Sequence, residues 1–309
     1  MSMICKACQS AGPHVTHVFK EMMFGMRDPF DYFECGGCGS IQRLTEVEDE
    51  GKFYPPDYYS FWEERPSFRS RITAVRDAHV LREKSIAGFF LNRLWPLRGM
   101  EGLERVQLNS NTKILDVGCG SASLLYRLAR AGFQNLTGVD PFVKVGSNSN
   151  GVRILKSNIQ NIDGKFDLIM FNHSLEHVLD PAETLTAARH LLSNTGSCLI
   201  RVPTCSSFAW KHYGRNWVQL DPPRHIVIFS RQGFLNLATR IGFRLDETID
   251  DSSDFQFWGS EMYCRDIALM SKPIDEIFSQ KEFGEFQERA AKLNSQGLGD
   301  QVAFIISPV

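Results

Sequence analysis

The sequence predicts an α/β protein whose core is a doubly wound, mostly parallel sheet, preceded by a small cysteine-containing unit. The first observation is a strand, a glycine turn, a helix and a second strand over residues 113–140. The second is a series of short apolar runs that alternate with helical periodicity between residues 152 and 249. The third is a pair of Cys-x-x-Cys motifs near the N-terminus. Alternating strands and helices are typical of a parallel sheet with both faces covered.

Composition narrows the class of protein further. The chain has 309 residues, of which 43% are hydrophobic and 23% charged, as expected for one large core with appendages. The formal net charge of −2 provides no basic field that would attract nucleic acid. No apolar run reaches the ~18 residues of a membrane span, so no membrane partner is expected. The first residues lack the pattern of a signal peptide, which predicts a cytoplasmic location.

The eight cysteines are predicted to serve as thiols and metal ligands rather than disulfides, because no secretory signal is visible. Two Cys-x-x-Cys knuckles can turn four thiolates towards one tetrahedral zinc ion. The predicted zinc ligands are Cys5, Cys8, Cys35 and Cys38. Residues 30–33 and 40–43 are expected to be the strands of this ribbon. Four thiolates leave no open position for catalysis, so its role is predicted to be structural. Redox-active or incidental thiols are the alternative, and the rival ligands His14 and His17 are expected to be surface residues.

Residues 46–110 are predicted to join the ribbon to the sheet. Their segment 53–62 is dense in aromatic side chains, which favours a packed linker because aromatic residues mostly serve as buried mass. The alternative is a lid over a substrate, to which Tyr58 and Tyr59 would offer hydroxyl groups. Residues 70–95 are expected to be helical, with a basic face that is exposed to solvent.

The most informative stretch is residues 113–125, an apolar strand that ends in Asp116 and passes through Gly118 and Gly120 into a helix. The glycines let a ligand lie against the backbone, where a Cβ would clash. The next strand ends in Asp140, at the spacing where nucleotide-binding βαβ units hold a ribose. The third glycine of a dinucleotide fingerprint is missing. The carboxylate of Asp116 suits a cationic amino group rather than a phosphate. An ordinary tight turn is the alternative interpretation of the glycines alone.

The segment from Asp116 to Gly120 resembles motif I, D-x-G-x-G, of class I S-adenosylmethionine-dependent methyltransferases, with Ala122 where that family often has glycine. Residues 172–181 resemble the H-x-L-E-H segment after the fourth strand of many small-molecule methyltransferases. The resemblance covers residues 113–243 and implies a Rossmann-like sheet of seven strands that binds S-adenosylmethionine. The cofactor-binding residues that it implies are Asp116, Gly118, Cys119, Gly120, Asp140, Pro141, Asn158, Ile159, Asn172 and His173.

Apolar runs supply the expected strands of this sheet. They lie at residues 113–116, 136–140, 152–155, 166–171, 197–203, 243–249 and 301–306. The last is expected to run antiparallel, as in the family. Helices are predicted over residues 182–192 and 230–242, the second with a serine at its start and a glycine at its end. Residues 255–297 are predicted to form a helical insertion before the last strand.

Residues 203–229 are too long and too polar for a simple connection, which indicates a substrate loop. They follow the fifth strand at the carboxyl edge of the sheet, where open parallel sheets bind ligands. Residues 221–225 resemble the P-x-H segment of zinc-ribbon methyltransferases among glycan-modifying enzymes. The predicted catalytic residues are His225, His173, His177 and Tyr59. Imidazoles suit proton transfer at neutral pH, and flanking prolines make His225 the first choice. Structural hydrogen bonding is the alternative for each histidine, and Glu176 could cap a helix or orient His173.

Together these features predict an S-adenosylmethionine-dependent methyltransferase that transfers a methyl group to oxygen or carbon of a small polar acceptor, of the sugar, nucleotide-sugar or glycan type. The alternatives are an RNA methyltransferase that reads with its ribbon, and an inactive cofactor-binding scaffold. The near-neutral charge argues against the first and the intact cofactor motif against the second. The predicted domains are a zinc ribbon (1–45), a linker or cap (46–110) and a methyltransferase domain (111–309).

Overall fold

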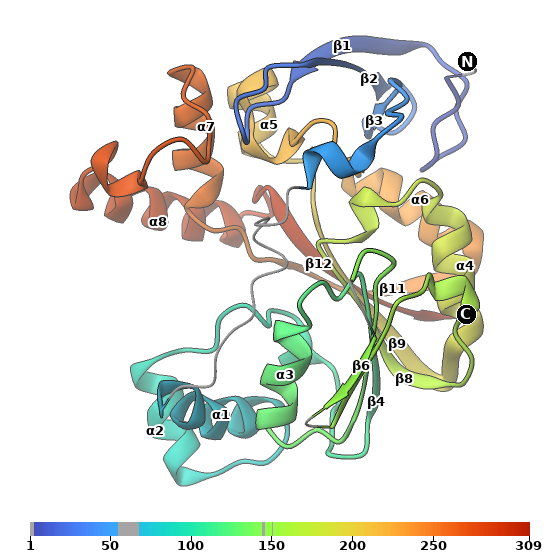
Figure 1. Cartoon of the computed structure of the whole chain (residues 1–309), viewed down its shortest axis with the longest axis vertical. Coiled ribbons are helices and arrows are strands. Elements are labelled where there is room, and N and C mark those ends of the chain that lie inside the picture. Colours follow the sequence, from blue (N-terminus) through green and yellow to red (C-terminus); the bar gives the residue numbers. More distant parts are fainter. Residues whose placement is uncertain (1–2, 55–67, 144–145, 150) are drawn as a thin grey trace.

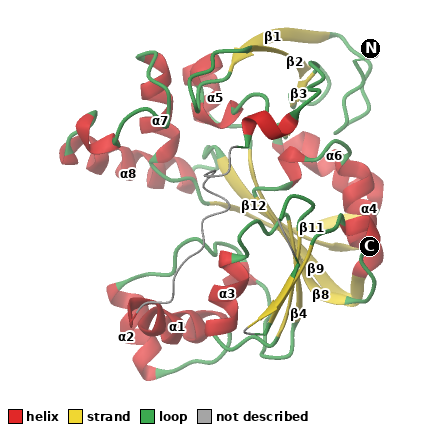
Figure 2. Cartoon of the chain, in the orientation of Figure 1, coloured by secondary structure: helices red, strands yellow, loops and turns green. Residues whose placement is uncertain are grey.

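A computed structural model describes residues 3–54, 68–143, 146–149 and 151–309 (Figure 1). A large central sheet is flanked on both faces by helices, and a smaller sheet, built mainly from the N-terminal part of the chain, lies beside it (Figure 2). The predicted α/β class is therefore confirmed. The tyrosines of the predicted lid, Tyr58 and Tyr59, lie outside the described residues.

The central sheet has eight strands in the order β11-β12-β9-β8-β4-β5-β7-β6. They are β4 (Lys113–Val117), β5 (Asn135–Val139), β6 (Ser147–Ser149), β7 (Val152–Leu155), β8 (Phe166–Asn172), β9 (Leu192–Pro203), β11 (Phe243–Asp250) and β12 (Gln301–Pro308). β12 is antiparallel to both its neighbours, as predicted. The prediction of seven strands was short by β6, an antiparallel edge strand. Its three residues are polar and exposed, so no hydrophobic period could reveal it.

The strands at the centre of the sheet are buried on both faces, as their continuous apolar runs predicted. Alternate residues of β4 and β8 enter two different cores. Leu115 and Phe171 pack with α4 (Pro181–Leu191) and α6 (Arg231–Ile241), whereas Ile114 and Met170 pack with α1 (Phe68–Leu81) and α3 (Ser123–Arg130). Figure 1 shows these two helical layers on opposite sides of the sheet. β4 lies between β5 and β8, so the chain order reverses at its carboxyl end, where doubly wound sheets bind ligands.

Local signals explain where the flanking helices begin and end. Ser230 accepts a hydrogen bond from the backbone of Gly233 at the start of α6, and Gly242 ends that helix with a φ of 90°. Asp180 accepts from two backbone N–H groups at the start of α4. Such caps satisfy the unpaired backbone donors of a first helical turn. Both predicted helices are confirmed.

The expected solvated basic face over residues 70–95 was partly wrong. The segment forms α1 and α2 (Ile86–Leu94), but Arg76 is buried in the first of them. Arg76 and Arg127 both bind the carboxylate of Asp77, which is fully buried. This pair of contacts joins α1 to α3, because a buried carboxylate requires charged partners.

The smaller sheet has the order β1-β2-β3-β10, from β1 (His14–Lys20), β2 (Pro29–Cys35), β3 (Ile41–Arg43) and β10 (Val227–Ile228). Its fourth strand comes from the predicted substrate loop, whose earlier part forms the short helix α5 (Phe208–Tyr213). The predicted helical insertion contains α7 (Phe255–Cys264) and α8 (Gln280–Ser295). These elements share a third core around Trp217, whose indole N–H donates to Asp300. The ribbon and the substrate loop are thus packed together, and the boundaries of the three predicted domains stay a prediction.

Candidate functional site

The glycine turn after β4 is fixed by its neighbours. Gly118 has a φ of 76°, and a Cβ there would lie 2.5 Å from the Cβ of Ser174. Ser174 donates its hydroxyl to the carbonyl of Val117 at 2.6 Å. The segment after β8 therefore packs directly against the turn, and only glycine combines this close approach with a left-handed backbone. Ala122 also has a positive φ, 57°, which explains why glycine is common there in the family.

Asp140, which follows β5, binds the same turn through its carboxylate. One carboxylate oxygen accepts the backbone N–H of Gly120 at 3.0 Å, and the other accepts that of Phe142 at 2.7 Å. Each oxygen retains a further lone pair, since a carboxylate has about four acceptor positions. Asp140 can therefore orient the turn and accept hydroxyl groups at the same time.

Asp116 is a buried carboxylate with an unsatisfied oxygen. Its side chain is almost fully buried, and Oδ1 has no hydrogen-bond partner among the described residues. Burial, and then the charge of Asp140, raises the pKa of Asp116 to about 7. A buried acid of this kind requires a cation. The amino group of S-adenosylmethionine would supply one, so these residues fit that cofactor.

The other predicted cofactor residues follow neighbouring strand ends. Cys119 lies within the glycine turn, Pro141 follows β5, Asn158 and Ile159 follow β7, and Asn172 and His173 lie at the end of β8. A hydrogen bond of 3.1 Å from Asp140 N to the carbonyl of Leu155 joins the ends of β5 and β7. Asn172 accepts from Arg201 at 3.3 Å and lines a small hollow with Leu124. These strands are parallel, so all the predicted positions lie along one edge of the sheet. Their contact with a cofactor stays a prediction.

The three predicted catalytic histidines gather around Glu176, which lies in the short helix after β8. Glu176 is fully buried, and the backbone N–H of Ile226 donates to its carbonyl at 2.8 Å. Its Oε1 lies 3.4 Å from Nδ1 of His173 and 4.0 Å from Nε2 of His225. The rings of His177 and His225 have centroids 4.7 Å apart. Residues far apart in the sequence thus form one cluster, hereafter the Glu176 cluster (Glu176, His173, His177 and His225).

Charge and burial act together within this cluster. Burial alone would raise the pKa of Glu176, but the nearby His173, His177 and His225 lower it to about 2. Burial, followed by the charge of His225, lowers the pKa of His177. Glu176 therefore stays ionised and His177 is neutral at physiological pH.

Two imidazoles of the cluster are held by backbone carbonyls. Nδ1 of His225 donates to Gln219 at 2.7 Å, and Nδ1 of His177 donates to Arg224 at 2.9 Å. A ring nitrogen that faces a carbonyl must carry a proton, so Nε2 is the nitrogen of each ring that can present a lone pair.

The N-terminal ribbon sheet supports the segment that carries His225. The hydroxyl of Tyr32 donates to the carbonyl of His225 at 2.8 Å, and Arg43 donates to the carbonyl of Pro223 at 2.6 Å. Arg224 forms a fully buried ion pair with Glu21 at 3.0 Å. The ribbon therefore fixes the position of a predicted catalytic residue.

Sequence reasoning missed Tyr54, which lies just before the undescribed part of the aromatic segment. Its hydroxyl is 3.3 Å from Nδ1 of His177, and its ring stacks on Phe142 with centroids 6.2 Å apart. Tyr54 thus connects the Glu176 cluster with the loop after β5. The aromatic density of residues 53–62 was the available signal, but it could not select the tyrosine that makes contact.

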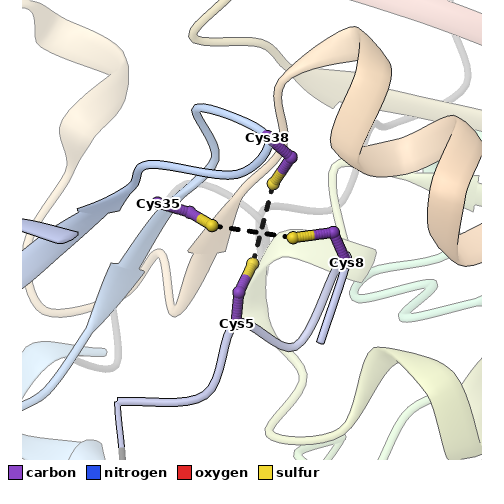
Figure 3. Close-up of side chains that lie close together, drawn as sticks. All are labelled: Cys5, Cys8, Cys35 and Cys38. Carbon is purple, nitrogen blue, oxygen red and sulfur yellow. Dashed lines mark hydrogen bonds between the residues drawn. The ribbon is translucent and has the colours of Figure 1, made fainter. Parts of the chain in front are cut away.

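The four predicted zinc ligands meet at one point, with their thiols directed towards one another (Figure 3). The Sγ atoms of Cys5 and Cys38 are 3.7 Å apart, and those of Cys8 and Cys35 are 3.6 Å apart. Tetrahedral zinc with Zn–S bonds of ~2.3 Å separates its sulfurs by about 3.8 Å, so the spacing fits that ion. The hydrogen bond from Cys5 lowers the pKa of the Cys38 thiol, which favours the thiolate that a metal binds. Zinc itself stays a prediction.

Within the described part of the chain, no helix has the length and apolar character needed to cross a bilayer.

Comparison with known proteins places these features in context. The sequence model of a methyltransferase domain matches residues 90–248. The ubiquinone biosynthesis O-methyltransferase of Serratia proteamaculans is 30% identical over 132 residues, 39% of this chain and 54% of that protein. The namesake from Saccharophagus degradans is 33% identical over 135 residues, 38% of this chain and 56% of that protein. This chain therefore spans about half the length of the curated relatives it matches. A mycolic acid cyclopropane synthase solved with S-adenosylhomocysteine and CTAB has a TM-score of 0.44 and 17% identity, over 71% of this chain and 84% of the synthase.

Proposed function

The chain belongs to the methyltransferase domain family, and from this membership we propose that it is an S-adenosylmethionine-dependent methyltransferase that acts on a small polar acceptor. The proposed acceptor is of the sugar, nucleotide-sugar or glycan type, and its oxygen is the proposed position. Relatives named O-methyltransferases support oxygen over carbon. A cytoplasmic location is part of the same proposal.

The observation that carries the cofactor assignment is the unsatisfied, buried carboxylate of Asp116 beside the glycine turn. A dinucleotide would place phosphates near this turn, and a buried carboxylate would repel them. An amino acid ammonium group is attracted instead. Asp140 at the end of the next strand is then in the position to accept ribose hydroxyl groups.

Methyl transfer requires two contributions from the protein: alignment of the acceptor with the methyl group, and removal of one proton from the acceptor. S-adenosylmethionine supplies a methyl group on a sulfonium, an excellent leaving group, so most of the rate depends on alignment. A hydroxyl acceptor must also lose its proton. In this proposal the proton passes to Nε2 of His225, whose orientation is set by the carbonyl of Gln219. The Glu176 carboxylate stabilises the imidazolium that results.

Calorimetry with S-adenosylhomocysteine tests the cofactor site directly. We expect Asp140→Ala to weaken binding by about one to two decades, since charge-assisted hydrogen bonds contribute roughly 1.5–3 kcal/mol. Asp163→Ala, at an exposed position away from the strand ends, is the matched control and should bind as the wild type does. Absence of binding to the folded wild-type protein would refute the cofactor assignment, and unchanged binding in Asp140→Ala would place the ribose elsewhere.

The raised pKa of Asp116 predicts that cofactor affinity depends on pH. Below its pKa of about 7 the free protein holds a proton on Asp116, and an incoming ammonium group must displace it. The affinity for S-adenosylhomocysteine should therefore rise between pH 5 and 7, by at most about one decade per pH unit, and level off above. Asp116→Asn should bind more weakly and lose this slope. A wild-type affinity that is flat across this range would contradict the role of Asp116.

The acceptor class is tested by a screen for methyl transfer to nucleotide sugars and to RNA, measured as release of S-adenosylhomocysteine. Turnover of a nucleotide sugar is the expected result. Turnover of RNA alone would make the ribbon a reader of nucleic acid. Tight cofactor binding with no transfer to either class would favour a scaffold role.

A further inference from the structure

The Glu176 cluster contains a buried carboxylate whose charge no hydrogen bond among the described residues compensates. Glu176 is fully buried, yet both carboxylate oxygens lack a hydrogen-bond partner among the described residues. His173 is close in distance at 3.4 Å but is not aligned to donate. Leaving a buried carboxylate without partners is costly, so a group absent from the protein chain is expected to satisfy it.

Two neighbouring imidazoles are oriented by backbone carbonyls. Both His177 and His225 donate their Nδ1–H to such a carbonyl, which leaves Nε2 as the nitrogen of each ring that can bind a ligand. Nε2 of His225 faces the Glu176 carboxylate at 4.0 Å. A lone pair and a carboxylate repel each other unless a cation lies between them. Metal-binding histidines typically donate their other N–H to a carbonyl in this way.

The spacing of these groups suits a metal ion. Glu176, His177 and His225 each offer a ligand atom within 4.8 Å of the other two. Two ligands at ~2.1 Å from one ion lie at most about 4.2 Å apart, so the 4.0 Å between His225 and Glu176 is within reach, and a pair near the 4.8 Å bound closes by a side-chain shift on binding. Two imidazoles and a carboxylate suit divalent ions and leave coordination positions open.

We propose that Glu176, His177 and His225 bind a divalent metal ion, separate from the cysteine site, at the carboxyl edge of the sheet. The site lies beside the glycine turn, because Ser174, two residues before Glu176, packs on Gly118. Its remaining positions would hold the acceptor oxygen and lower the pKa of that hydroxyl. This role rests on the proposed methyl transfer, whereas ion binding does not. The ion then replaces direct proton transfer to His225, and the half-exposed His173 is left as the proton acceptor.

Manganese is the probe, added to protein that holds one zinc ion per chain, at the cysteine site. Mn²⁺ favours carboxylate and imidazole over thiolate, so it should leave the cysteine site occupied by zinc. Electron paramagnetic resonance of free Mn²⁺ counts the bound ions without any acceptor or turnover. We expect one Mn²⁺ per wild-type chain, and binding that is weaker by at least about 100-fold in Glu176→Gln, which keeps the shape but removes the charge. Glu183→Gln, at an exposed position of α4, is the matched control and should bind like the wild type.

The outcomes separate the two proposals. Wild-type protein that binds S-adenosylhomocysteine but no Mn²⁺ at millimolar concentration would overturn the metal site and leave the methyltransferase proposal standing. Equal binding by Glu176→Gln and the wild type would place the ion elsewhere and also overturn the assignment. If Glu176→Gln does not fold, His225→Asn removes a different ligand and should show the same loss. Mn²⁺ binding without S-adenosylhomocysteine binding would instead refute the cofactor proposal alone.

Discussion

Replacing His225 by alanine is expected to lower turnover by about 10²–10⁴-fold, the usual contribution of a positioned proton acceptor, while the affinity for S-adenosylhomocysteine stays nearly unchanged. The reason is location. His225 lies in the cluster around Glu176, whereas the groups assigned to the cofactor are the glycine turn, Asp116 and Asp140. Steady-state release of S-adenosylhomocysteine with an accepted substrate, together with calorimetry, measures both quantities. A metal ion held by His225 would produce a loss in the same direction.

Two control variants distinguish a chemical role of His225 from a structural one. His190→Ala changes an exposed histidine of α4 and should leave turnover unaltered. His225→Asn retains a side-chain N–H that can donate to the carbonyl of Gln219, but it has no basic ring nitrogen. If His225→Asn recovers most of the activity, His225 serves to hold the loop, and the search for the base moves to His173 or Tyr59. Activity of His225→Ala within a few-fold of the wild type would have the same consequence.

Cys35→Ser is expected to lose the metal of the N-terminal site and to unfold the ribbon, while the central sheet remains folded. Structural zinc stabilises small domains by an apparent ~10–16 kcal/mol, so the ribbon sheet should not survive without it. Elemental analysis measures the metal, and hydrogen exchange over residues 3–45 measures the unfolding. Wild-type protein without stoichiometric zinc or iron would show that the four thiolates have another role.

The same variant should lose turnover, although the four ribbon cysteines are separate from the Glu176 cluster. Tyr32 of the ribbon holds the carbonyl of His225, and Arg43 holds that of Pro223. Unfolding the ribbon is therefore expected to release the segment that carries His225, whereas the affinity for S-adenosylhomocysteine should persist, because the glycine turn belongs to the central sheet. Cys264→Ser, an exposed cysteine outside the ribbon, is the control and should behave like the wild type. Full turnover in metal-free Cys35→Ser would contradict this coupling.

Much of the central fold followed from local chemistry. We could predict the strand ending in Asp116, the glycine turn and the strand leading to Asp140, because each element has its own local signal. The signals are an apolar run, a residue free to adopt positive φ, and a polar residue at the strand end. The caps of α6 at Ser230 and Gly242 were visible for the same reason. The edge strand β6 was not, because its exposed polar residues pack against nothing.

The surroundings of single charges could not be predicted in this way. Arg76 looked like part of a solvated helix face, but the fold buries it against Asp77, whose carboxylate also binds Arg127. Glu176 offered two plausible local roles, and neither indicated three histidines around one buried carboxylate. The partner of a charged side chain depends on which groups lie near it in the folded protein, and sequence spacing does not give that information.

The sequence by itself determined the family, the glycine turn after Asp116 and the four-cysteine motif, because each lies in a short contiguous pattern whose chemistry depends on residue type and spacing. Only the tertiary structure decided how these parts cooperate. It paired β10 of the substrate loop with β3 of the ribbon, set Tyr32 against His225, and brought Tyr54 to His177. Those contacts join residues far apart in the chain, and burial in a shared core holds them together. Such contacts exist only once the chain has folded, so no local pattern could have revealed them.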